Sequence, residues 1–177
     1  MDGRWMTSAA CAALLAAGGI ACSPDTSGQS PATSAQPAPT TPPPIAGFPD
    51  MSSYTTADPT AFAVNGPPAS GASMSTPDGM ICWLSAYPMP EYASISCTGP
   101  RPDRGPGIWN VTAERNGETS VTPSDEKPTE PPAPRLPALH VLYYQPDVFC
   151  GVDSDATTAC RVGGHGFLLT PASTKVF

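Results

Sequence analysis

The sequence predicts an all-β fold: a small disulfide-bonded β-sandwich or partly open barrel, preceded by a disordered proline-rich tether. First, no stretch after residue 22 repeats its apolar residues at helical spacing. Secondly, 25 prolines divide the chain into short segments, several of which alternate apolar and polar residues as half-buried strands do. Thirdly, four cysteines form two closely spaced pairs, a pattern typical of neighbouring strands joined by disulfides.

The N-terminal segment has the pattern of an export signal. Residues 5–21 carry no charge, follow Arg4 and are rich in Ala, Leu and Gly. The run is short and weakly apolar compared with a membrane span of about 20 residues. We therefore expect a signal peptide over residues 1–21 and cleavage before Cys22.

Two kinds of signal end in this way. The run Gly19-Ile20-Ala21-Cys22 resembles a bacterial lipoprotein signal, in which the cysteine receives a diacylglyceryl group, although Gly19 stands where Leu, Val or Ile is usual. An ordinary signal peptidase would cut the same bond and leave a secreted protein with a free thiol. Cysteine parity favours the lipid, because acylation of Cys22 leaves an even four cysteines for disulfides. We expect an acylated Cys22 that anchors the protein on the outer face of the cytoplasmic membrane.

The mature chain divides into a tether and one domain. Residues 22–53 contain eight prolines among Ser, Thr, Ala and Gln, and such a segment buries too little apolar surface to offset the entropy of ordering it. We expect a single β-domain over residues 54–177. A second proline-rich stretch, acidic and at about residues 123–137, is expected to be a surface loop inside that domain because the pieces on either side are small.

The cysteines are expected to join two hairpins, Cys82 to Cys97 and Cys150 to Cys160. Each cysteine shares its alternation phase with apolar or β-branched neighbours, as a cross-strand pair requires. Bridges between the two hairpins would close longer loops and are favoured by loop entropy, so the pairing stays open at this point. Neither pair has the close spacing of a structural zinc site, and we expect no metal and no cofactor.

Residues 109–114 alternate cleanly and are expected to form a strand. Asn116-Gly117 follows as a hairpin signal, but a two-residue loop would place Val121 on the polar face, which leaves the register open. Two further strands are expected between prolines, at residues 139–144 and 166–170.

Several of these segments together resemble a known kind of protein. Thr-Pro-Asp-Gly-Met-Ile-Cys at residues 76–82 and Ile-Ser-Cys at 95–97 precede the second cysteine pair, and Gly-Gly-His-Gly-Phe-Leu-Leu follows it at 163–169. This order resembles a family of uncharacterised secreted and lipid-anchored proteins of actinobacteria. The resemblance covers roughly residues 60–177. It implies one small disulfide-bonded β-domain in the cell envelope and brings no known activity.

Gly163, Gly164, His165 and Gly166 form the segment with the most chemical interest. We interpret it as a structural turn between two strands; the alternative is a small extracytoplasmic, hydrolase-like enzyme that uses His165. The sequence contains no nucleophile elbow, HExxH, P-loop or dinucleotide fingerprint. A net charge of −7 with only eight Lys and Arg argues against a nucleic-acid partner.

The sequence therefore favours a non-enzymatic envelope lipoprotein, a binding or structural module held on the membrane by its anchor. An envelope glycan or protein is the expected partner. The aromatic loop at residues 83–92 is the expected contact surface, because Tyr and Trp combine a large apolar face with a polar tip.

Overall fold

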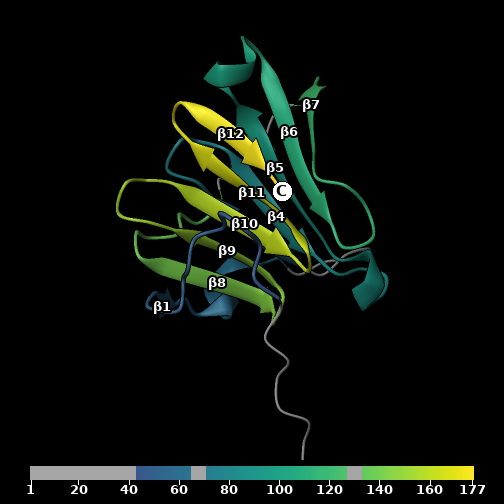
Figure 1. Cartoon of the computed structure of the whole chain (residues 1–177), viewed down its shortest axis with the longest axis vertical. Coiled ribbons are helices and arrows are strands. Elements are labelled where there is room, and N and C mark those ends of the chain that lie inside the picture. Colours follow the sequence, from purple (N-terminus) through teal and green to yellow (C-terminus); the bar gives the residue numbers. More distant parts are fainter. Residues whose placement is uncertain (1–42, 65–70, 127–132) are drawn as a thin grey trace, which may run out of the picture. The chain divides into compact units, whose positions relative to one another are not determined.

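Two six-stranded sheets pack face to face and confirm the predicted all-β class (Figure 1). The sheets do not close on each other, so the sandwich is formed and the barrel is not. The computed structural model describes residues 43–64, 71–126 and 133–177. The expected signal peptide, Cys22 and the expected tether up to residue 42 lie outside the described residues.

The first sheet has the strand order β2-β3-β4-β5-β6-β7, with bounds Ala63–Val64, Gly71–Ser75, Ile81–Ser85, Ser94–Pro100, Ile108–Glu114 and Ser120–Ser124. The second has the order β1-β8-β9-β10-β11-β12, with bounds Thr55–Thr56, His140–Gln145, Val148–Val152, Thr158–Val162, His165–Thr170 and Ser173–Val176. Short 3-10 helices lie at Pro59–Phe62 (η1), Pro90–Tyr92 (η2) and Pro102–Arg104 (η3). Strand β1 pairs in parallel with β8, and the other neighbouring strands are antiparallel.

The two halves of the chain repeat one arrangement. Five consecutive antiparallel strands, β3 to β7, make up most of the first sheet, and β8 to β12 do the same in the second. In both runs a disulfide joins the second strand to the third. The Pro77-Asp78 and Pro146-Asp147 dipeptides occupy the turn between the first two strands of each run.

Both disulfides are the predicted local ones. Cys82 and Cys97 are direct partners in the β4–β5 register with Cα atoms 3.9 Å apart, and Cys150 and Cys160 are partners in β9–β10 at 4.1 Å. Such short separations are typical of opposed residues whose backbones do not hydrogen-bond to each other. The pairing between hairpins that loop entropy would favour is not formed.

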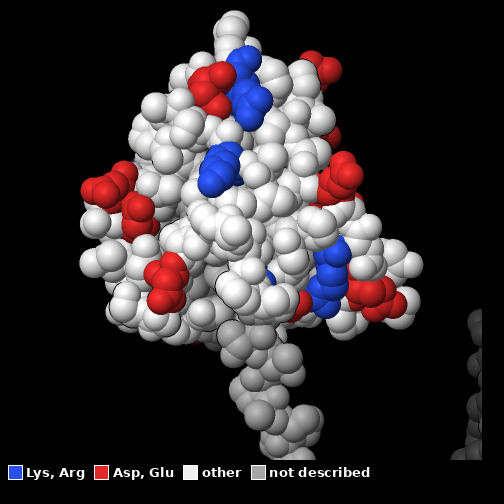
Figure 2. Space-filling view, viewed as in Figure 1, with Lys and Arg blue, Asp and Glu red and all other residues white. Residues whose placement is uncertain are grey.

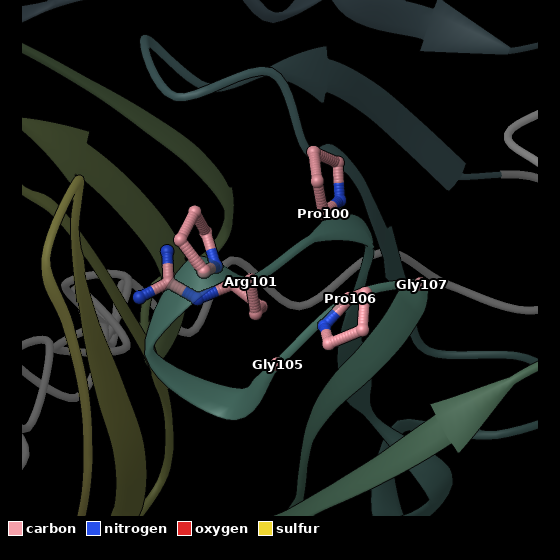
Figure 3. Close-up of a pocket in the computed structure, with 6 residues that line it drawn as sticks. Pro100, Arg101, Gly105, Pro106 and Gly107 are labelled. Atoms are coloured by element: carbon pink, nitrogen blue, oxygen red, sulfur yellow. The ribbon is translucent and has the colours of Figure 1, made fainter.

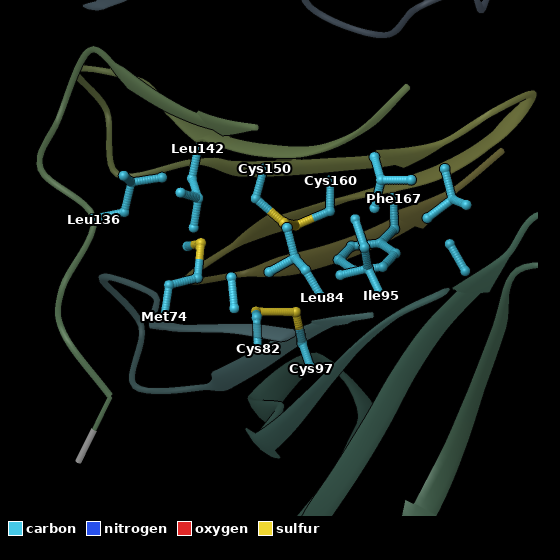
Figure 4. Packing of buried hydrophobic residues seen from close by; sticks show 14 of the residues in the cluster. Met74, Cys82, Leu84, Ile95, Cys97, Leu136, Leu142, Cys150, Cys160 and Phe167 are labelled. Atoms are coloured by element: carbon cyan, nitrogen blue, oxygen red, sulfur yellow. A yellow bond between two sulfur atoms is a disulfide. The ribbon is translucent and has the colours of Figure 1, made fainter. Parts of the chain in front are cut away.

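The core lies between the sheets, and the bridges meet there (Figure 4). The Sγ atoms of Cys82, Cys97 and Cys160 lie within 4.8 Å of one another, although they come from opposite sheets. The same cluster contains large apolar side chains from both sheets and from the segment before β8: Met74, Leu84, Ile95, Leu136, Leu142 and Phe167.

The expected strands at 109–114, 139–144 and 166–170 correspond to β6, β8 and β11. The register that the sequence left open is settled by a connection longer than two residues. Val121 pairs with Val111, and Ser120 pairs with Thr112. Val121 therefore packs against the core, as its apolar side chain requires.

The expected boundary between tether and domain lies too late in the chain. Residues 43–53 lie on the outer face of the second sheet, where Met51 is buried and the half-buried Phe48 ring packs edge-on against Phe149 and Phe177. At residue 43 the carbonyl oxygen accepts a hydrogen bond from Arg161. The high proline content of this segment led to the prediction of a tether, but Phe48 and Met51 pack on the sheet and hold the segment there.

The acidic proline-rich stretch is partly ordered into the domain. Its first residues belong to β7, and residues 127–132 lie outside the described part of the chain. Beyond them, the Pro134 carbonyl accepts a hydrogen bond from the Ser75 amide, and Leu136 is buried in the core. The expected surface loop is therefore shorter than predicted at both ends.

Within the described ranges, no helix has the length and apolar character needed to cross a membrane.

Candidate binding surface at one end of the sandwich

Four connections meet at one end of the sandwich, which we call the tyrosine end. They are the connections β4–β5, β6–β7, β8–β9 and β10–β11, at residues 86–93, 115–119, 146–147 and 163–164. Arg115 forms an ion pair with Asp147 at 2.6 Å, and the Gly163 amide donates to the Asp147 carbonyl oxygen at 2.9 Å. These contacts join connections from both sheets.

The β4–β5 connection presents three large apolar side chains to solvent. Tyr87 is 54% exposed, Met89 49% and Tyr92 57%. Two prolines restrict the backbone, and the short helix η2 adds hydrogen bonds from the Tyr92 amide to the Met89 carbonyl (2.9 Å) and from the Ala93 amide to the Pro90 carbonyl (3.1 Å). Exposed apolar groups on a restrained backbone are typical of a contact surface.

The neighbouring β6–β7 connection holds this loop in place. Asn116 donates from Nδ2 to the Glu91 carbonyl oxygen at 2.9 Å, and the Arg115 amide donates to the Ala93 carbonyl oxygen at 2.9 Å. The loop is thus attached to the sheet behind its apolar tip, which leaves the tip itself free of these bonds.

Arg161 connects the tyrosine end to the start of the described chain. Its side chain is buried on β10 and donates from Nε to the Gly163 carbonyl oxygen at 2.7 Å and from Nη2 to the carbonyl oxygen of Pro43. Burial lowers the pKa of Arg161, because desolvation penalises the charge, and the nearby Asp147 opposes that shift. One series of contacts therefore runs from Pro43 through Arg161, Gly163, Asp147 and Arg115 to the aromatic loop.

The tyrosine end is acidic. Glu91 and Glu118 are exposed on its connections and Glu114 at the end of β6, whereas Arg115 is neutralised by Asp147. In Figure 2 the basic groups on the face in view are few and separate, and they form no continuous patch there. The arrangement favours neutral or cationic partners over anionic ones.

The glycine-histidine segment is a shorter turn than expected. Only Gly163 and Gly164 form the hairpin connection, and the positive φ of +58° at Gly163 alone matches a type II′ turn. His165 pairs with Val162 as the first residue of β11, and Gly166 lies within the strand. A Cβ atom on Gly166 would lie 2.6 Å from the Cys160 carbonyl oxygen, so its glycine is needed for close packing.

The side chain of His165 makes no hydrogen bond or ion pair within the described part of the chain. A hydrolase-like site needs a base that is oriented by a third group and lies close to a nucleophile. The geometry around His165 does not assemble such a group among those residues.

The opposite end of the sandwich contains a charged cluster that the sequence did not indicate. Arg101 is fully buried, and its Nη1 lies 2.5 Å from Oδ2 of Asp78. Its Nε donates to Oγ1 of Thr174 on β12 at 2.8 Å, which links the two sheets. Nη2 approaches Oδ1 of Asp103 at 2.9 Å as an ion pair without hydrogen-bond alignment. We call these four residues the Arg101 cluster.

Asp103 is stabilised in its charged form by this cluster. Burial raises its pKa, but the hydrogen bond from Thr174 and the charge of Arg101 lower it more, and the net shift is downward. The buried guanidinium is therefore compensated by two carboxylates and has no charge left for a ligand.

A hollow of about 390 Å³ lies beside the cluster, lined by Pro100, Arg101, Pro102, Gly105, Pro106 and Gly107. Figure 3 shows the Arg101 guanidinium directed away from Pro106 and Gly107, toward the other sheet. The remaining lining is proline and glycine, which offers few polar side-chain groups to a ligand. The tyrosine end is the better candidate.

Two other groups of potential ligand atoms have structural roles. The clustered cysteine sulfurs are oxidised, and a metal ligand would need the thiolate. In the β9–β10 turn, Oδ1 of Asp153 accepts from the amides of Asp155 (2.8 Å) and Thr157 (2.7 Å), which is ordinary turn chemistry.

No family model, curated protein or solved structure matches this chain. The tyrosine end is therefore argued from the geometry of this structure.

Proposed function

We propose that this protein is an exported lipoprotein, held on the membrane by an acyl group on Cys22, whose β-domain is a non-enzymatic contact module. The exported state is supported by the apolar N-terminal run and by two disulfides, which persist in oxidising compartments. Acylation is supported by parity, since Cys22 is the one cysteine of residues 22–177 outside the two bridges.

One observation carries the contact role: Tyr87, Met89 and Tyr92 are about half exposed on a single restrained loop. Ordering such a loop on binding costs little, because prolines and hydrogen bonds to the neighbouring connection already fix its backbone. A tyrosine ring contributes apolar area and its hydroxyl contributes a hydrogen bond, a combination that suits both glycans and polypeptides.

The anchor is tested by replacing Cys22. A Cys22→Ala variant should leave the membrane fraction, and mass spectrometry of the wild-type N-terminus should show an acylated Cys22. If mass spectrometry instead showed an unmodified Cys22 in the wild-type protein, acylation would be contradicted even if the variant left the membrane fraction. The proposal that the protein is exported would not be affected.

The contact role is tested by a binding screen of the purified chain against envelope glycans and secreted proteins. Changing Tyr87, Met89 and Tyr92 together to Ser should weaken binding at least tenfold, because each buried apolar side chain contributes about 1.5–3 kcal/mol. Leu139→Ser is the matched control, since Leu139 is 50% exposed and lies at the other end of β8. Equal losses in both variants would contradict the assignment of this loop.

A further inference from the structure

The aromatic loop and the point where the described chain begins lie at the same end of the sandwich. Pro43 is held by Arg161, and Arg161 contacts Gly163 in the β10–β11 turn. That turn is bonded to Asp147, and Asp147 pairs with Arg115 beside the aromatic loop. The chain that leads to Cys22 therefore leaves the domain at the same end as Tyr87, Met89 and Tyr92.

The length of that chain limits how far this end can lie from whatever holds Cys22. Pro43 follows Cys22 by 21 residues. Even fully extended, that length spans no more than about 76 Å. A surface at the attachment end needs only weak intrinsic affinity for the bilayer, because anchoring makes the encounter intramolecular.

The chemistry of the loop suits the boundary between lipid and water. Tyrosine is enriched at that boundary, where its ring contacts acyl chains and its hydroxyl stays hydrated. Met89 adds a flexible apolar side chain between the two tyrosines. The same end exposes Glu91, Glu114 and Glu118, so attraction to anionic headgroups, which requires Lys or Arg, does not contribute.

We propose that the loop of Tyr87, Met89 and Tyr92 inserts into the interface of the bilayer that holds Cys22, as a second contact that orients the domain on the membrane. The proposal rests on the proposed anchor at Cys22. Insertion into the bilayer and binding of a polypeptide are expected to depend differently on the charge of the partner. The exposed glutamates oppose an anionic bilayer, whereas they would attract a cationic polypeptide.

The experiment uses the mature chain, residues 22–177, coupled through the Cys22 thiol to a maleimide phospholipid in phosphatidylcholine vesicles. Hydroxyl-radical footprinting, read by mass spectrometry, reports which side chains are in contact with water. Met89 should react several-fold more slowly in the coupled protein than in a Cys22→Ser protein mixed with the same vesicles. Leu139, which is 50% exposed at the other end of β8, should react at the same rate in both.

A pair of charge variants makes the test specific to the loop. Tyr87→Glu should restore the reactivity of Met89 in the coupled protein, because a charge resists transfer into the interface. Leu139→Glu, a change at similar exposure, should leave Met89 protected. Both positions are exposed, and tryptophan fluorescence and intact disulfides confirm that each variant is folded.

Lipid composition separates the bilayer from a polypeptide partner. On phosphatidylglycerol vesicles, Met89 should be less protected at low salt and should regain protection at high salt, because salt screens repulsion of the glutamates. Unprotected Met89 on phosphatidylcholine would overturn the proposal. So would protection that appears only when a cationic polypeptide is added and that salt abolishes.

Failure of the anchor and failure of the contact remain distinguishable. Chemical coupling supplies the lipid whether or not the cell acylates Cys22, so the footprint reports on the loop alone. Mass spectrometry of the natural N-terminus reports on the anchor alone.

Discussion

Replacing Arg101 by Met is expected to be among the most damaging single changes in the domain. Methionine keeps much of the apolar stem but removes the charge that compensates Asp78 and Asp103. Those carboxylates are only 8% and 14% exposed, so water does not take over the role of the guanidinium. The Nε bond to Thr174, which links the two sheets, is lost as well.

The expected loss follows from the burial of the groups left behind. Removing one partner of a buried ion pair costs about 3–5 kcal/mol, mostly because an uncompensated charge remains. Small domains are stable by about 5–15 kcal/mol in total, so the variant loses about a fifth or more of its stability. Adding Asp78→Asn and Asp103→Asn to Arg101→Met should recover much of that loss, since the orphaned charges disappear.

The loss should also depend on pH, and Asp103 sets the direction. In the wild type its pKa lies below the usual value, so its charged form stabilises the fold at neutral pH and that contribution is lost only as pH falls through the lowered pKa. Without Arg101 the lowering charge is gone while burial remains, and the pKa of Asp103 rises. Asp103 of the variant then binds its proton at higher pH than in the wild type. The difference in stability should therefore be smaller near pH 4 than at pH 7.

The assay is urea unfolding at pH 7 and pH 4, followed by tryptophan fluorescence with the disulfides intact. If the free energies of unfolding of the wild type and Arg101→Met differed by less than about 1 kcal/mol at pH 7, the reasoning would be refuted. The Arg101 cluster would then contribute no more than an exposed ion pair does. A difference that stays constant between the two pH values would contradict the role given to Asp103. A triple variant no more stable than the single one would show that lost packing, not charge, is responsible.

Three further outcomes follow from the geometry. Replacing both Cys82 and Cys97 by Ser should cost about 3 kcal/mol in urea unfolding, from the loop that the bridge closes; an unchanged midpoint would contradict this. Gly166→Val should destabilise strongly, because a Cβ atom there lies 2.6 Å from a backbone oxygen, whereas Gly164→Val has open space and should be far milder; thermal unfolding compares the two. His165→Gln should fold and keep any ligand found for the wild type, and a folded variant that loses activity or binding would instead support the enzyme alternative.

The features that the sequence predicted are the local ones. The disulfide hairpins could be inferred because each cysteine stands in phase with apolar neighbours a few residues away, and the opposed register of Cys82 and Cys97 follows from that alternation. The aromatic loop expected at residues 83–92 is confirmed only in part: β4 continues to Ser85, so Trp83 lies half-buried on that strand, whereas Tyr87 and Tyr92 are exposed. Such signals need no knowledge of the other sheet.

The features that the sequence did not predict depend on contacts between distant segments. Nothing near Arg101 indicates burial, because its partners Asp78 and Thr174 come from other turns and from the other sheet. Phe48 and Met51 lie in a proline-rich stretch whose composition resembles a tether, and only the apolar outer face of the second sheet gives them a place to pack. The length of the connection that contains Asn116-Gly117 could not be predicted either. It depends on the register in which Val121 pairs with Val111 and packs against the core.

Each disulfide lies wholly within one sheet, and this determines how the molecule comes apart. A single cut at residues 127–132, between β7 and β8, would divide the chain into two fragments with no covalent bond between them, each carrying one bridge and a run of five antiparallel strands. Their reassembly would depend on the apolar core and on residues 43–57 of the first fragment, which lie across the sheet formed by the second. The bridges thus stiffen the two halves separately, and the halves are held to each other by non-covalent contacts alone: the apolar core, the pairing of β1 with β8, and polar contacts such as Arg101 to Thr174 and Arg115 to Asp147.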